Sequence, residues 1–190
     1  MLHIKLPHIL FLFVLLASSV FAQTEDKRIA EIDHLYEQTN EAIRVAEENA
    51  PYSEKYVVEI AVNKTGNSYP AVGAYSNVTR FHYTFGDREK DPYPNRLMKA
   101  AVVTKRSASI TSSEFLYDAA GQLVYGIVRT DGELQRETRL YFAAGRLIRL
   151  NDDGKEVSVR NRNVIETAAA FKRESARLST LFAAALKEGL

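Results

Sequence analysis

A segment of nine residues that occurs twice constrains the fold of this chain more than any other feature. The sequence LYDAAGQLV begins at Leu116, and the closely similar LYFAAGRLI begins at Leu140. Each copy places two alanines and a glycine between hydrophobic residues, and glycine readily takes the positive φ that a tight turn needs. Each copy therefore predicts a β-hairpin. Asp131 and Gly132, between the copies, predict a further turn, so we expect an up-and-down antiparallel meander over 110–118, 122–130, 133–142 and 146–151.

The two copies resemble the short tyrosine-containing hairpin repeats, known as YD repeats, of bacterial surface and toxin proteins. The resemblance covers residues 116–148, and Phe142 stands in the second copy where the first has Asp118. It implies a pair of hairpins and assigns no activity, because a fold motif carries no function by itself.

Further strands are predicted upstream of the repeats, where hydrophobic residues alternate with polar ones. The alternation covers 56–62 and 79–85, and a third strand is expected over 96–105. A polar stretch over 86–95 contains two prolines, which prevent regular strand pairing. The region 53–157 therefore predicts about seven antiparallel strands. We interpret Asn151–Gly154 as a turn, because it lacks the ligand pattern of a calcium loop.

Two helices are predicted to flank the strands, over 24–49 and 161–188. In each, hydrophobic residues recur at spacings of three and four, which gives one apolar stripe. We expect both stripes to pack on one face of the sheet. The predicted fold class is α+β, similar in architecture alone to helix-grip and half-barrel folds, an analogy that transfers no activity.

The N-terminal 22 residues have the pattern of a signal peptide. Lys5 precedes an apolar run over 9–16, and Val20-Phe21-Ala22 places small side chains at the positions that a signal peptidase reads. The run is too short to span a membrane, and an uncleaved N-terminal anchor is the alternative. We expect cleavage near Ala22 to leave 23–190 as a single exported domain, periplasmic or extracellular, with no transmembrane anchor.

The composition excludes several classes of site. The chain has no cysteine, so disulfides, thiolate metal sites and lipoprotein anchoring are excluded. Its 25 basic residues balance 24 acidic ones, which argues against nucleic-acid binding. His34 and His82 stand in no metal-binding motif, and no nucleotide-binding or hydrolase motif is present. We therefore predict no catalytic residue, no metal and no cofactor.

Aromatic side chains of the predicted sheet form the candidate ligand-binding site. They are Tyr56, Phe81, Tyr83, Phe85 and Tyr125. Large amphipathic side chains of this kind line cavities for apolar ligands, or alternatively fill a solid core under the helices.

Three functions remain open from the sequence. The leading hypothesis is an exported, non-enzymatic protein that holds an apolar or lipid-like small molecule against the aromatic sheet. The alternative is an envelope-associated structural or protein-interaction module, which the repeated hairpins and the five arginines of the last strands favour; these are Arg129, Arg136, Arg139, Arg146 and Arg149. An ion-paired surface is the competing interpretation of these arginines. A hydrolase that uses Glu114, Glu133 or Glu137 is the third hypothesis.

Overall fold

The structure is a computed structural model, and it describes residues 6–70, 73–85, 89, 96–107, 109–132 and 135–189, with side chains from 24 to 187 within these ranges. Its elements are α1 (Leu6–Glu48), β1 (Tyr56–Val62), β2 (Ser68–Tyr69), β3 (Gly73–Thr84), β4 (Arg96–Arg106), β5 (Ser109–Tyr117), β6 (Leu123–Asp131), β7 (Arg136–Ala143), β8 (Arg146–Asp152), β9 (Lys155–Val157) and α2 (Arg162–Gly189).

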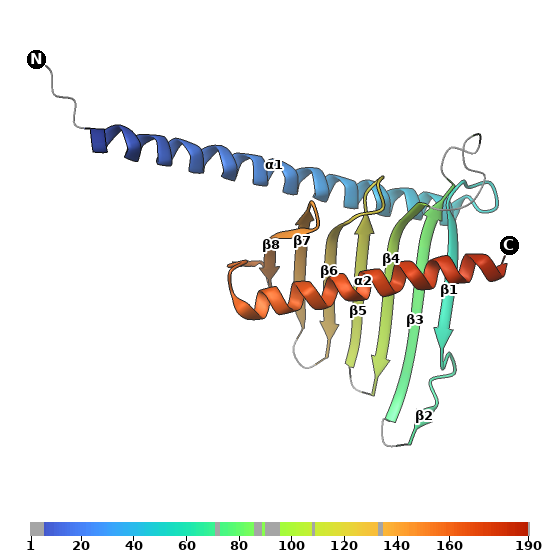
Figure 1. Ribbon diagram of the computed structural model, residues 1–190. Helices are drawn as coiled ribbons and strands as arrows, with labels where there is room; N and C mark the ends of the chain where they lie inside the picture. Colours follow the sequence, from blue (N-terminus) through green and yellow to red (C-terminus); the bar gives the residue numbers. More distant parts are fainter. Residues whose placement is uncertain are drawn as a thin grey trace, which may run out of the picture.

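The strands form one open antiparallel sheet in which neighbours in sequence are neighbours in space (Figure 1). The order is β1-β3-β4-β5-β6-β7-β8-β9, and β2 pairs with the start of β3. The predicted α+β meander is confirmed. Seven strands correspond to the predicted ones, while the short strands β2 and β9 add to the edges. The turn predicted at Asn151–Gly154 is present, but it consists of Asp153 and Gly154 alone, because Asn151 and Asp152 belong to β8 and pair with β9.

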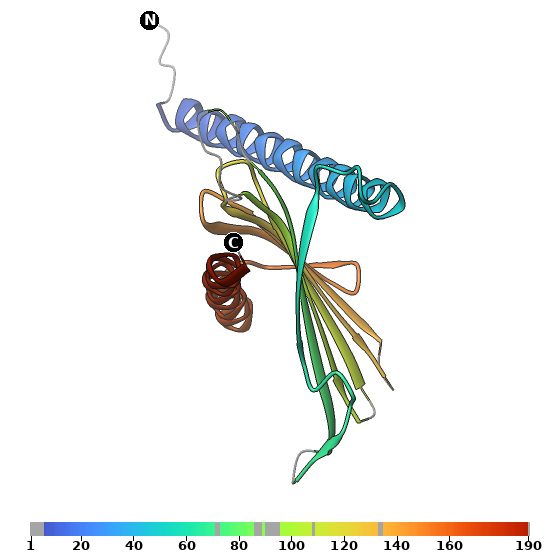
Figure 2. The ribbon, with the colours of Figure 1, turned by 90° about the vertical axis from the view of Figure 1, so that its right-hand side faces the viewer.

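The two helices lie on opposite faces of the sheet, so the prediction that both pack on one face is wrong (Figures 1 and 2). Successive residues of a strand point to opposite faces. Phe115 and Tyr117 of β5 belong to the core under α2, whereas Leu116 between them belongs to the core under α1. Consecutive hydrophobic residues in a strand, such as 115–117, therefore indicate a sheet that is covered by a helix on each face.

The core under α2 is built from rings and aliphatic side chains. Phe171 of α2 stacks on Phe115 of β5, with ring centroids 4.1 Å apart. The same ring lies directly over Gly126, where an added Cβ would be 2.1 Å from the Phe171 ring. Leu178 of α2 and Phe81 of β3 are completely buried in this core. The missing side chain at position 126 is thus what lets the α2 helix approach the sheet closely.

The core under α1 is smaller and contains tyrosines. Ile29 and Ile32 of α1 are buried against Leu116 of β5 and Tyr125 of β6. The Tyr36 ring of α1 lies 4.9 Å from that of Tyr125. α1 crosses the end of the sheet where the repeated hairpins turn, as Figures 1 and 2 show.

The first copy of the repeat closes its turn through an aspartate. The Asp118 carboxylate accepts hydrogen bonds from the backbone N–H groups of Ala120 and Gln122, both at 2.9 Å. Tyr117 pairs with Leu123 across this turn. A short polar side chain that accepts backbone hydrogen bonds in this way stabilises a longer loop.

The second copy lacks that aspartate and closes with a tighter turn. Phe142 takes the place of Asp118 and pairs with Leu147. Ala144 and Gly145 then form the turn alone, with φ values of 49° and 72°. Two consecutive residues with positive φ are typical of a two-residue hairpin turn.

Because the turns differ, Tyr117 pairs with Leu123 in the first hairpin, whereas Phe142, which comes one residue later in the repeat, pairs with Leu147 in the second. A shift of one residue in strand pairing moves a side chain to the other face of a sheet. Tyr117 of the first copy faces α2, whereas the equivalent Tyr141 faces α1. Along one row of the sheet, Leu116 pairs with Tyr125, and Tyr125 pairs with Tyr141. The equivalent tyrosines of the two copies therefore pack against different helices.

Several predictions fall outside the described residues. The 86–95 loop, apart from Glu89, and the Glu133 end of the predicted turn belong to this group, as do the side chains of the predicted signal peptide. The backbone of α1 is continuous from Leu6 to Glu48, and the helix predicted over 24–49 lies within it. Within the described part of the chain, no helix is both long and apolar enough to cross a membrane.

Candidate functional site

Four of the five predicted ligand-binding aromatics gather on the α2 face, around Phe182 of α2. Tyr56 lies 5.6 Å from Tyr83 and 5.0 Å from Phe85, measured between ring centroids. Phe182 lies 5.3 Å from Tyr83 and 5.6 Å from Phe81. Phe81 is completely buried, while Tyr56, Tyr83 and Phe85 are half-buried. These rings contact one another and the end of α2.

The fifth predicted residue, Tyr125, lies on the opposite face. Its ring contacts those of Tyr36 and Tyr141, with a centroid distance of 5.1 Å to Tyr141. Burial raises the pKa of its hydroxyl well above the ordinary value, and the neighbouring Tyr141 adds to this. The structure therefore divides the predicted set between two cores.

A depression of about 400 Å³ lies between α2 and the turns of the two repeated hairpins. Tyr117, Leu123 and Phe142 give it an apolar floor. Its rim is formed by α2 and the turns, through Gly121, Gln122, Ala144, Gly145, Lys172, Ser175, Ala176 and Ser179. The volume is in the range of small-molecule sites, which begins at roughly 300 Å³. We call this region the hairpin depression.

Polar groups are concentrated on the α2 side of the hairpin depression. The Ser175 hydroxyl donates a hydrogen bond to the Tyr117 hydroxyl at 3.1 Å, and Ser179 donates to the Ser175 carbonyl at 3.1 Å. The exposed Lys172 donates to the Gly145 carbonyl at 2.7 Å. Burial raises the pKa of Tyr117, so its hydroxyl keeps its proton. The depression thus combines an apolar floor, two serine hydroxyls and one cation.

The hairpin depression is not predicted by the sequence pattern. Ser175 stands within the apolar stripe of α2, and a polar residue in such a stripe is the one signal that pointed to it. The repeat predicted both hairpin turns, but their position against α2 depends on the packing of the sheet.

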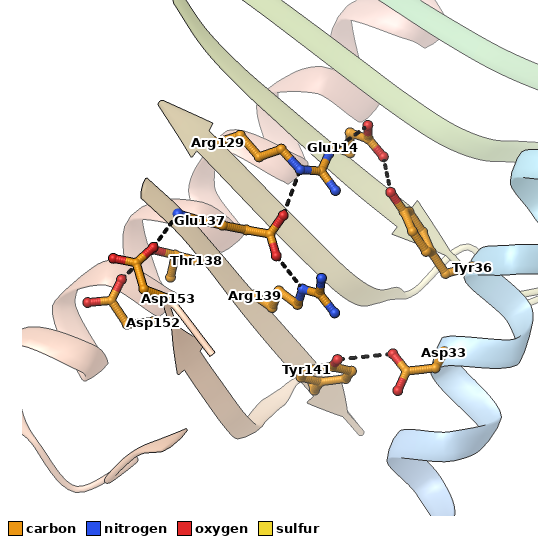
Figure 3. Close-up of polar contacts among 10 residues, drawn as sticks. All are labelled: Asp33, Tyr36, Glu114, Arg129, Glu137, Thr138, Arg139, Tyr141, Asp152 and Asp153. Atoms are coloured by element: carbon orange, nitrogen blue, oxygen red, sulfur yellow. Dashed lines mark hydrogen bonds and ion pairs between the residues drawn. The ribbon is translucent and has the colours of Figure 1, made fainter. Parts of the chain in front are cut away.

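A network of charged side chains occupies the α1 face (Figure 3). The Glu114 carboxylate accepts a hydrogen bond from the Tyr36 hydroxyl at 2.7 Å and pairs with the Lys99 ammonium at 2.8 Å. Arg129 joins this carboxylate to that of Glu137, with distances of 3.5 Å and 2.8 Å. The side chains of Lys99 and Glu114 are only 11% and 20% exposed, so their charges are largely removed from water.

These contacts keep the carboxylates ionised. Burial alone would raise the pKa of Glu114, but the hydrogen bond and charge of Lys99 outweigh it, and the pKa lies below the usual value. The pKa of Glu137 is also lowered, by Arg129 and Arg139, against the opposing effect of burial. A glycosidase-type general acid needs a raised pKa. The Glu114 carboxylate, which accepts a hydrogen bond from Tyr36 of α1, is instead suited to hold α1 on the sheet.

Four of the five arginines of the last strands are ion-paired, which confirms the ion-paired interpretation for them. Arg129 and Arg139 contact Glu137, Arg136 contacts Asp152, and Arg149 contacts acids of α1. Among the described residues, no three histidine or acidic side chains are grouped so as to hold a metal ion.

Comparisons with protein-family models, with curated proteins and with solved structures find no match to this chain.

Proposed function

We propose that this chain is an exported, non-enzymatic binding protein that holds a small amphipathic molecule in the hairpin depression. The observation that carries the proposal is the combination, in one depression of about 400 Å³, of an apolar floor with hydroxyls and a cation at the rim. Ligand sites commonly pair a hydrophobic lining with a few polar groups that orient the ligand. The predicted aromatic residues around Phe182 then support the α2 helix that forms one wall.

The chemistry of the rim defines the class of ligand. The apolar body would lie on Leu123 and Phe142, and its polar end would meet Lys172 and Ser175. A carboxylate or sulfonate is the preferred polar end, because an ammonium group forms charge-assisted hydrogen bonds with anions. The proposed ligand is therefore an apolar molecule with one anionic group.

Titration with two fluorescent probes tests the site. Anilinonaphthalene sulfonate carries the anionic group, and N-phenyl-naphthylamine has a similar apolar body without it. Ala176→Phe fills the depression from the exposed side of α2 and should weaken binding of both probes by about tenfold or more. Ala170→Phe is the matched control, because Ala170 is exposed on α2 and does not line the depression. Equal binding by the wild type and both variants would refute the proposed site.

Replacement of the lysine separates the roles of the two ends. Lys172→Met should weaken binding of the sulfonate by about tenfold or more, which corresponds to the loss of one charge-assisted hydrogen bond, and leave the neutral probe nearly unchanged. Lys187→Met removes the same charge from the last turn of α2 and should change neither. An equal loss for both probes would contradict the role given to Lys172.

Native mass spectrometry of protein purified from its own host tests the physiological ligand and the compartment together. A retained small molecule, together with a measured mass that matches a chain beginning at Gln23, would support the proposal. A copurified envelope protein in place of a small molecule would support the interaction module instead, and an intact N-terminus would refute export by cleavage.

A further inference from the structure

The two edges of the sheet differ in how they are protected. β9 has only three residues, two of which are charged, and short charged strands are a common way of blocking an edge. β1 has seven residues, and no strand among the described residues pairs with its outer edge. Its sequence is YVVEIAV, in which Val57 is 54% exposed and Val62 is 46% exposed. A long hydrophobic edge of this kind readily accepts a further strand.

We infer that β1 is the contact surface for a second copy of this chain, which pairs its own β1 in the antiparallel direction across a two-fold axis. Directly opposed side chains in an antiparallel pair lie on the same face of the sheet, and side chains alternate between the faces along each strand. The two-fold axis must therefore pass through a residue of β1, and not between two residues. With the axis at Ile60, Val58 of each copy lies opposite Val62 of the other. Ile60 then lies opposite Ile60, so every pair on the α2 face joins two β-branched side chains.

The charges of β1 are compatible with this register and exclude a neighbouring one. Glu59 is exposed on the α1 face, where it pairs with Arg80 of β3 at 2.7 Å. An axis at Glu59 would place two carboxylates opposite each other, and like charges in directly opposed positions destabilise a sheet. An axis at Ile60 instead places each Glu59 opposite Ala61 of the other copy. The apolar match therefore favours the axis at Ile60, and the charge pattern is compatible with it.

Pairing in this register would join two sheets into one continuous antiparallel sheet across the axis. The contact involves one strand from each copy, so its area is at the low end for specific interfaces. We therefore expect a weak, concentration-dependent dimer, with the hairpin depression of each copy far along the sheet from the axis.

Sedimentation velocity over a concentration series, on the chain without its first 22 residues or on the protein as exported, measures this dimer. Ala61 is exposed, so both of its variants should keep the fold. Ala61→Glu would create two opposed carboxylate pairs and should weaken the dimer about fivefold, whereas Ala61→Lys would create two opposed ion pairs and should strengthen it by a similar factor. At about 1 mM protein, a dimer with an association free energy of about −4 kcal/mol would be detected. A wild-type chain that stays monomeric up to this concentration overturns the inference.

A disulfide assay tests the register independently, because the chain has no cysteine of its own. Glu59→Cys and Ala61→Cys chains should form a crosslinked dimer when mixed, and much less of it when each is oxidised alone. Crosslinking that is equal in all three samples, or Ala61 variants of opposite charge that behave alike, would overturn the proposed pairing. Binding of another protein to β1 with no self-association would do so as well.

Discussion

The two faces of the sheet hold their helices by different interactions, although the strands between them are the same. On the α2 face, stacked rings and aliphatic side chains form a hydrophobic core, and the Phe171 ring fills the space above Gly126. On the α1 face, Tyr36 and Lys99 meet a carboxylate at Glu114, and Tyr141 donates a hydrogen bond to Asp33 of α1 at 3.0 Å.

The contrast between the faces shows how one repeated sequence serves two purposes. Because the second hairpin is shifted by one residue, its tyrosine faces α1, while the tyrosine of the first hairpin faces α2. Non-directional hydrophobic burial stabilises the α2 side, and hydrogen bonds and ion pairs fix the position of α1. Substitutions on the two faces should therefore differ in size and in their dependence on pH.

The largest effect is expected from Phe171→Ala on the α2 face. Removal of a buried ring that stacks on Phe115 should lower the free energy of unfolding by about 3 to 5 kcal/mol, through lost burial and the cavity that remains. Urea denaturation measures this loss. Ile165→Ala is the matched control, because Ile165 of α2 is 54% exposed and should cost less than about 1 kcal/mol. Similar losses for the two variants would contradict a solid core on this face.

On the α1 face, Lys99→Met should cost about 2 to 3 kcal/mol, because it leaves the largely buried Glu114 carboxylate with the Tyr36 hydroxyl and, as a cation, only the more distant Arg129. The double variant Lys99→Met/Glu114→Gln removes the unpaired charge and should recover part of this loss. Denaturation of the single and double variants forms a double-mutant cycle. Strict additivity in that cycle would show that the two side chains do not interact.

The two equivalent tyrosines give the closest comparison of the faces. Tyr141→Phe removes a hydrogen bond to a carboxylate and should cost about 1.5 kcal/mol, while Tyr117→Phe removes a bond between neutral hydroxyls and should cost about 1 kcal/mol. Differential hydrogen exchange should then show faster exchange in α1 for Tyr141→Phe and in α2 for Tyr117→Phe. Faster exchange in the same helix for both variants would contradict the assignment of the tyrosines to opposite faces.

The sequence predicted the strands and helices well because each has a clear period and clear turn residues. The YVVEIAV segment became β1, and the repeated glycines became turns, as local pattern and backbone conformation require. Which helix Tyr141 faces was not predictable in the same way. It depends on the strand register of the second hairpin, where Phe142 replaces the aspartate that closes the first turn. The grouping of Lys172 with Ser175 and two hairpin turns depends further on how α2 crosses the sheet.

The smallest effect concerns pH, and it should arise on the α1 face. Burial, together with the nearby Lys99, lowers the pKa of His82 below its ordinary value of 6.5. The unfolded chain therefore binds a proton at His82 more readily than the folded chain, and stability should decline as the pH falls from 6.5 toward the lowered folded value. Glu114 has a lowered pKa too, so its contribution is present above about pH 4.5 and is lost only as the pH falls further, through the folded value.

The two groups can be separated by variants, since their pH windows differ. His82→Gln should flatten the dependence of the unfolding free energy on pH just below 6.5 and leave the decline below 4.5 intact, because, of these two groups, His82 is the one that changes its proton binding in the upper window. Glu114→Gln should reduce the decline in the lower window. Denaturation midpoints measured at intervals from pH 7 to pH 3 test both. If His82→Gln leaves the upper slope unchanged, that slope comes from another group and the environment described for His82 on the α1 face is incorrect.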